Sequence, residues 1–202
     1  MPPMQNQLLR TIRDEHQSLA AMLDALQIVL ARGPGDAPAR YFELVASMLV
    51  YIKEFSEHVH FPKEVELLFP TVLEVAPDTV RAVARLEKSH RDSVAELYEL
   101  QTLLAAWQQD GISSQHRPAF ERAAARVCAS YLEQIRMEEV SILPAAEQLV
   151  KDAQWRRLVK LHHEATATGQ AGALDADAYE LMYNRIALWL TRFLTHKRLA
   201  HE

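Results

Sequence analysis

Apolar residues recur every three or four positions along most of the chain, which is the spacing of amphipathic helices. In the first stretch, Ile12, Leu19 and Leu23 fall on one stripe, and the turn residues Gly33-Pro34-Gly35 follow it. The same periodicity returns after each later group of turn residues. It predicts helices over about 4–31, 38–70, 78–107, 117–142, 152–167 and 175–199.

Three prolines lie within or at the ends of these predicted helices. Pro62 is expected to disturb the second helix, because it removes one backbone hydrogen-bond donor. Pro70 is expected to close the last turn of that helix, and the fourth helix is expected to end near Pro144.

Four long helices with short connections predict an all-α fold, an up-down four-helix bundle. The two predicted helices after residue 151 are additional to it. We therefore predict a bundle over residues 1–150 and a C-terminal helical extension over residues 151–202, packed on the same domain.

Composition and charge narrow the class of protein. The chain has 202 residues, of which 49% are hydrophobic and only five are glycine, so it is globular and rich in helix formers. Its net charge of −5 offers no basic surface for nucleic acid. A single cysteine, Cys128, excludes an internal disulfide framework. The chain shows neither a membrane-length apolar run nor a signal-peptide pattern at its start, which predicts a cytoplasmic protein without membrane partners.

A shift of the sequence by 74 residues superimposes the first half of the predicted bundle on the second. The apolar stripes coincide under this shift. Three polar or helix-breaking positions also coincide: His16 with His90, Glu64 with Glu138, and Pro70 with Pro144. His60 meets a different residue, Gln134. The repeat predicts a pseudo-two-fold bundle in which these polar residues converge on the central axis.

The repeated polar residues are also predicted to face inward. His16 and His90 lie on apolar stripes, and His60 and Glu64 are four residues apart on one helix face. A histidine on such a stripe can simply be a core residue bonded to a backbone carbonyl. A buried carboxylate, however, needs a partner. A metal ion would supply one, and imidazole together with carboxylate suits iron, manganese or zinc.

Four segments carry a resemblance to a known family. They are IRDEHQSLAAMLDAL around His16, HFPKEVELLFP from His60, LEKSHRDSVAELYEL around His90 and QIRMEEVSILP from Gln134. These segments resemble the hemerythrin-like proteins of the HHE cation-binding type, over about residues 8–146. The resemblance implies two non-heme irons, with His16 and His60 serving one iron, His90 and residue 134 serving the other, and Glu64 and Glu138 bridging them.

The sequence departs from the family pattern at Gln134, where the family has histidine. An amide oxygen is a weaker iron ligand than an imidazole, so three outcomes are open: a labile di-iron site, a single metal, or an empty site. His162 or His163 could replace the missing ligand if the fifth helix caps the bundle. Glu57 and Tyr131 each lie three residues before a ligand position. They are predicted to form a hydrogen bond with a metal ligand or with the bound oxidant.

The resemblance favours a non-heme iron protein that binds dioxygen or a related oxidant in sensing, storage or stress protection, rather than a catalyst. A ferritin-like iron or oxygen oxidase is a second possibility, since Glu57 and His60, like Glu87 and His90, match the Glu-x-x-His pairs of that class. Those pairs would lie on consecutive helices, which is not the ferritin-like order. A third possibility is a bundle that has lost its metal and serves as an interaction or regulatory module.

Overall fold

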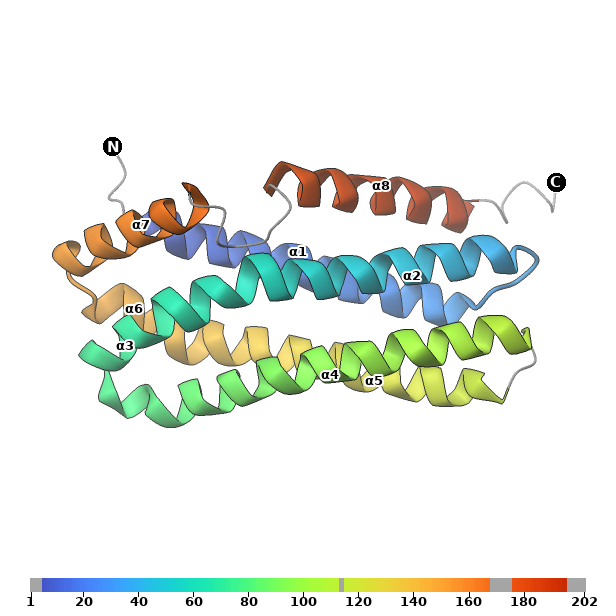
Figure 1. The fold of residues 1–202 in the computed structure, drawn as a ribbon, viewed down its shortest axis with the longest axis horizontal. Helices are drawn as coiled ribbons and strands as arrows, with labels where there is room; N and C mark the ends of the chain where they lie inside the picture. Colours follow the sequence, from blue (N-terminus) through green and yellow to red (C-terminus); the bar gives the residue numbers. More distant parts are fainter. Residues whose placement is uncertain (1–4, 113–114, 168–175, 196–202) are drawn as a thin grey trace.

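The computed structural model describes residues 5–112, 115–167 and 176–195, and every regular element within those ranges is helical. Figure 1 shows four long helices running alternately up and down, which confirms the predicted all-α up-down bundle with two further C-terminal helices. The first and third long helices are α1 (Gln5–Arg32) and α4 (Val80–Asp110), the latter entered through a short 3₁₀ turn, η3 (Pro77–Thr79).

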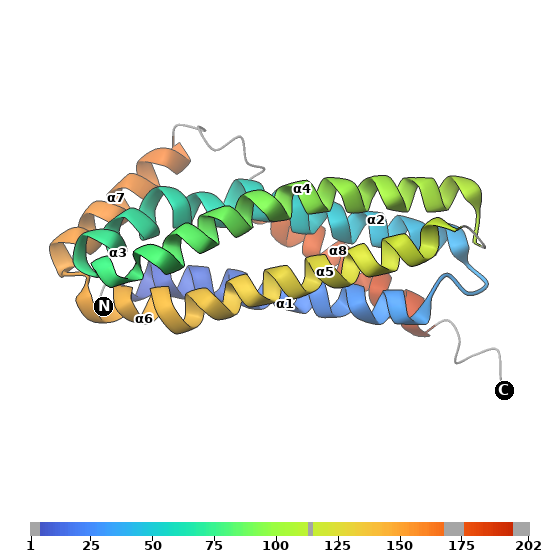
Figure 2. The same ribbon diagram turned by 90° about the horizontal axis from the view of Figure 1, so that it is seen from below.

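The second and fourth long helices are each built from several segments. The second comprises α2 (Pro38–Phe55), the π-helical η1 (Ser56–His60) and η2 (Lys63–Leu68), and α3 (Phe69–Val75). The fourth comprises α5 (His116–Met137), the π-helical η4 (Glu138–Ile142) and α6 (Leu143–Leu149). Figure 2 shows both helices running on through these junctions.

The prediction that Pro70 and Pro144 end their helices is wrong, because the helices continue to Val75 and Leu149. Each proline follows a residue whose N–H bonds five positions back: Phe69 donates to the Glu64 carbonyl, and Leu143 to the Glu138 carbonyl. The widened π turn relieves the clash that a proline ring makes with the fourth preceding carbonyl in an α-helix.

Pro62 acts in the same way. The N–H of Phe61 donates to the Ser56 carbonyl, so the helix is locally π-helical before Pro62 but does not break. The predicted disturbance at Pro62 is therefore confined to the hydrogen-bond pattern. His60 and Glu64 remain on one continuous helix.

The 74-residue repeat extends to the backbone. The shift carries the bounds of α3 onto those of α6, and it carries η2 onto the π-helical region around η4. The segment η1 has no π-helical counterpart in α5, where Arg136 occupies the position equivalent to Pro62. A π turn thus occurs just before each of these prolines, and the π turns lie where the predicted ligands are.

The bundle interior consists of two apolar clusters separated by a polar layer. Cluster A lies toward the loops that join α1 to α2 and α4 to α5, and it includes Leu19, Ile52, Leu97, Trp107 and Tyr131. Cluster B lies toward α3 and α6, and it includes Ile12, Leu68, Leu86, Ile142 and Trp155. Each long helix passes from one cluster to the other at a predicted ligand, so the polar layer is enclosed by apolar side chains at both ends.

The two C-terminal helices, α7 (Asp152–Ala167) and α8 (Ala176–Thr195), pack on the bundle. Trp155 and Leu158 of α7 belong to cluster B, beside the segment η2 that carries Glu64. Tyr179 and Ile186 of α8 belong to cluster A, and α8 runs along α2 (Figure 1). Among the described helices, none has both the length and the apolar character that crossing a membrane requires.

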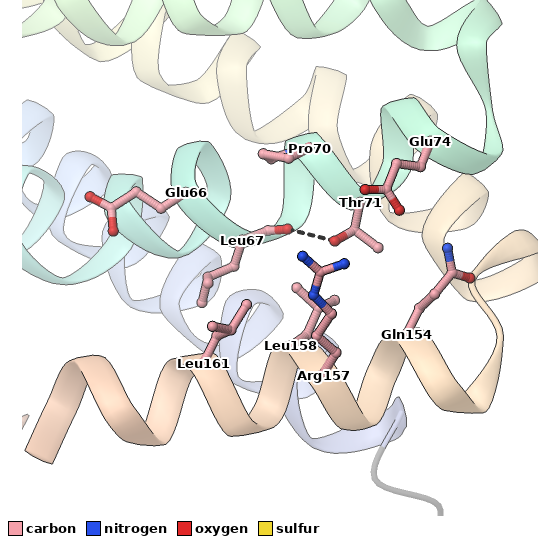
Figure 3. A pocket seen from close by; sticks show the side chains of 9 residues that line it. All are labelled: Glu66, Leu67, Pro70, Thr71, Glu74, Gln154, Arg157, Leu158 and Leu161. Carbon is pink, nitrogen blue, oxygen red and sulfur yellow. Dashed lines mark hydrogen bonds between the residues drawn. The ribbon is translucent and has the colours of Figure 1, made fainter.

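A pocket between α7 and the η2–α3 segment offers a matched pair of leucines (Figure 3). Leu158→Ala is expected to lower the free energy of unfolding by about 2–3 kcal/mol, the lower part of the range for buried leucines, because the side chain is 3% exposed but borders this pocket. Leu161→Ala, at a position 41% exposed on the same pocket, should change it by less than about 0.5 kcal/mol. Urea unfolding measures both, and a loss in Leu158→Ala as small as that expected for Leu161→Ala would show that α7 adds no stability through Leu158.

Candidate metal centre

The polar layer is centred on two carboxylates, Glu64 from η2 and Glu138 from η4, which are 0% and 1% exposed. His16 of α1 approaches both. Its Nε2 lies 2.9 Å from Glu138 Oε2 and 3.5 Å from Glu64 Oε1. His60, one helical turn before Glu64, places its Nε2 3.3 Å from Glu64 Oε1. The continuous helix through Pro62 makes this last contact possible.

Four of the predicted ligands form one compact donor group. One donor atom from each of His16, His60, Glu64 and Glu138 lies within 4.8 Å of the others, and all four residues are buried. Two imidazoles and two carboxylates therefore form a buried group of a size that can hold a metal ion.

Each histidine of this group is held from its far side by a carboxylate. The Nδ1 of His16 lies 2.8 Å from Glu139 Oε1, and the Nδ1 of His60 lies 3.0 Å from Glu15 Oε2. Since a carboxylate accepts, each Nδ1 donates, and the Nε2 atoms face the central glutamates. The other carboxylate oxygen of Glu15, Oε1, accepts a hydrogen bond from the Lys63 ammonium at 2.5 Å.

Glu15 and Glu139 were not among the residues predicted from the sequence. Their positions carry no spacing signal, because each contacts a histidine on another long helix, His60 for Glu15 and His16 for Glu139. Only the packed bundle reveals that these carboxylates orient the ligand histidines, as outer carboxylates commonly do in metal sites.

His90 of α4 also faces the two glutamates. Its Nε2 lies 3.3 Å from Glu138 Oε1 and 3.5 Å from Glu64 Oε2. The ring stacks on Phe61, with ring centres 3.9 Å apart and planes 11° from parallel. Its Nδ1, however, is buried without a hydrogen-bond partner among the described residues.

Gln134 of α5 is buried but directs its amide group to serines. Its Nε2 donates to Ser93 Oγ at 2.6 Å and to Ser89 Oγ at 2.9 Å. The amide oxygen has no hydrogen-bond partner among the described residues. Gln134 thus shares the polar layer, but its amide nitrogen is committed to α4.

The two residues predicted to bond a ligand or the oxidant lie on the cluster A side of the layer. Glu57 is 3.7 Å from Lys53, and the hydroxyl of Tyr131 is buried without a hydrogen-bond partner among the described residues. The contacts that the structure records to ligand histidines come instead from Glu15 and Glu139. The side chains of His162 and His163, named as possible replacements for a ligand at position 134, fall outside the described residues.

The electrostatics of the layer favour a positive charge between the two glutamates. Burial acts to lower the pKa of His16, but its hydrogen bond with Glu138 and the negative charges of Glu138 and Glu64 outweigh burial and raise that pKa to about 10. Burial raises the pKa of Glu64 well above its usual range, and the charge of Glu138 raises it further. For Glu138, burial also acts to raise the pKa, but hydrogen bonds from His16 and His90 lower it.

These residues fit a bound metal cation. Both carboxylate oxygens of Glu64 are buried and have no hydrogen-bond partner among the described residues, which leaves acceptor capacity that a cation would use. In the absence of a metal, the positive charge of a protonated His16 partly compensates the negative charge of the glutamate pair. A divalent ion bound to the imidazole Nε2 would replace that proton, and the N₂O₂ donor set suits iron, manganese or zinc.

The comparison with protein families agrees with this chemistry. The family model described as the hemerythrin HHE cation binding domain matches residues 7–146, which include all four long helices except the first two residues of α1 and the last three of α6. A comparison with curated protein sequences finds no match. The matched region covers more than two thirds of the chain and contains the buried His/Glu cluster, and the chain therefore belongs to the hemerythrin family of HHE cation-binding domains.

Proposed function

We propose that this protein binds non-heme iron and, with it, dioxygen or a related small oxidant in sensing, storage or stress protection. The observation that carries the proposal is the buried donor group of His16, His60, Glu64 and Glu138, in which one donor atom from each residue lies within 4.8 Å of the others. A group of this composition inside an apolar bundle is poorly explained by stability alone, because buried ionic groups are often replaceable by apolar residues without loss of stability.

His16, His60, Glu64 and Glu138 would hold the metal. Iron, when bound, supplies the redox chemistry through which a small oxidant can be held reversibly. The protein contributes orientation through Glu15 and Glu139, which fix the two imidazoles with Nε2 toward the glutamates. It contributes a low-polarity surrounding through clusters A and B, which limit the access of water to the layer.

Two other functions make different use of the same bundle. A ferritin-like oxidase would use Glu57 together with His60, but the contact recorded for the Glu57 carboxylate is with Lys53, 3.7 Å away. A module that has lost its metal would have no need of the paired orientation of His16 and His60. The observed contacts therefore favour a binding site.

The test is the metal content and oxidant response of the full chain, purified without chelator or a nickel column. We expect iron to be present or to be taken up from Fe²⁺ under anaerobic conditions, and dioxygen to produce a visible absorption band. A colourless protein that takes up no iron would contradict the proposal. If ferrous iron is turned over repeatedly, and not in a Glu64→Ala variant, the protein is an oxidase instead.

The carboxylate behind His16 provides a prediction about affinity. Glu139→Ala removes the acceptor of the His16 Nδ1 proton and is expected to weaken Fe²⁺ binding by about 10–100-fold, the usual effect of losing such an outer partner. Glu133→Ala, on the same long helix, is the matched control: the Glu139 side chain is 35% exposed, the Glu133 side chain is 41% exposed, and Glu133 pairs with Arg136. Competition with a chelator measures both affinities. Equal affinities for the two variants would exclude an orienting role for Glu139.

A further inference from the structure

The pseudo-two-fold repeat allows the two halves of the metal centre to be compared contact by contact. The shift of 74 residues relates Glu15 to Ser89 and His60 to Gln134. The Glu15–His60 contact, at 3.0 Å, is reproduced by the Ser89–Gln134 contact, at 2.9 Å. The two halves therefore place these equivalent residues in contact, and the chemistry of the side chains in each half can be compared.

The first difference is the ligand atom itself. In one half, the Nε2 of His60 faces Glu64 at 3.3 Å. In the other half, the amide nitrogen of Gln134 donates to Ser93 Oγ. The Ser93 hydroxyl donates its proton to the Ser89 carbonyl, at 2.8 Å, so it must accept the hydrogen bond from the amide nitrogen of Gln134. The NH₂ group of Gln134 therefore points to the serines, and only a neutral amide oxygen remains for a metal.

The second difference is the support behind the ligands. His60 has the carboxylate of Glu15, whereas Gln134 has the hydroxyl of Ser89. His16 has the carboxylate of Glu139, and the equivalent partner of His90 would be residue 65, which is valine. The unpartnered Nδ1 of His90 is the direct consequence of this replacement. One half thus has two carboxylate-supported imidazoles, and the other has a single unsupported imidazole.

From these differences we infer that the site binds one metal ion per chain tightly, on His16, His60, Glu64 and Glu138, rather than the pair that the family pattern implies. The inference rests on the proposed metal-binding function. In this arrangement His90 is not a ligand of a second ion. Its Nε2 donates a hydrogen bond to Glu138 at 3.3 Å and lies 3.5 Å from Glu64, on the side of the glutamate pair that a second cation would occupy.

The decisive measurement is the metal stoichiometry of the full chain. The metal-free protein is loaded with excess Fe²⁺ under anaerobic conditions, freed of unbound metal by gel filtration, and analysed for iron and protein content. We expect about one iron per chain. About two irons per chain would overturn the inference while leaving the proposed function intact. No retained iron would overturn the proposed function and the inference together.

Two reciprocal variants test which half holds the ion. Gln134→Ala removes the amide and is expected to leave the stoichiometry at about one. His60→Gln gives the first half the amide of the second and is expected to abolish retention of iron. Circular dichroism melts of both metal-free variants verify that they fold. Loss of iron from folded Gln134→Ala, or retention by folded His60→Gln, would overturn the assignment of the ion to the His16–His60 half.

Discussion

Replacing Glu64 with leucine is expected to remove the increase in melting temperature that Fe²⁺ gives the wild-type protein. A ligand that binds only the folded state at a hundred times its dissociation constant stabilises that state by about 2.7 kcal/mol. For a chain of 202 residues this corresponds to a rise of about 5–11 °C. Glu64 supplies one of the four donor groups, and both of its oxygens lack a hydrogen-bond partner among the described residues. Without it we expect no rise.

Glu66→Leu is the matched control, because Glu66 is exposed and lies on the same π-helical segment, η2, as Glu64. It makes the same substitution on the same stretch of helix, at a residue that lines the pocket against α7 (Figure 3). The Glu66→Leu variant should keep the full response to Fe²⁺ in differential scanning calorimetry under anaerobic conditions. A persistent response in Glu64→Leu would remove this glutamate from the metal centre.

The helices were predictable from the sequence because their apolar periodicity is the cause of their packing. The stripe containing Ile12, Leu19 and Leu23 of α1 is buried on both sides of His16, as its spacing predicts. The predicted ends at Pro70 and Pro144 were wrong for a physical reason. A proline ends an α-helix by its ring clash and missing donor, whereas a π turn immediately before it relieves the clash, so the helix continues past the proline.

The candidate ligands were predictable only in part. The sequence itself contains the spacing of His60 and Glu64 and the repeat that relates them to Gln134 and Glu138. The structure brings His60, Glu64 and Glu138 into one donor group. The carboxylates of Glu15 and Glu139 were not predictable, because they contact residues 45 and 123 positions away in the sequence. Such contacts depend on helix packing and rotation, which periodicity does not specify at the level of single atoms.

The two central glutamates are expected to differ in what they contribute to the metal-free protein, although both belong to the donor group. Glu138 is the close partner of His16, at 2.9 Å, and it also contacts His90 at 3.3 Å. Glu64 lies 3.3–3.5 Å from three histidines, and neither of its oxygens has a hydrogen-bond partner among the described residues. Removing Glu138 breaks a buried ion pair, whereas removing Glu64 leaves that pair intact.

Glu138→Leu is therefore expected to lower the free energy of unfolding of the metal-free protein by about 3–5 kcal/mol, the usual loss when one partner of a buried pair is removed. Glu64→Leu should leave it within about 1 kcal/mol of wild type or raise it, because the variant buries an apolar group in place of unsatisfied oxygens. Urea unfolding in the presence of a chelator measures both values, and comparable losses in the two variants would contradict the unequal pairing. A carboxylate that adds nothing to the stability of the metal-free fold, yet is required for the response to Fe²⁺, would be retained for the metal alone.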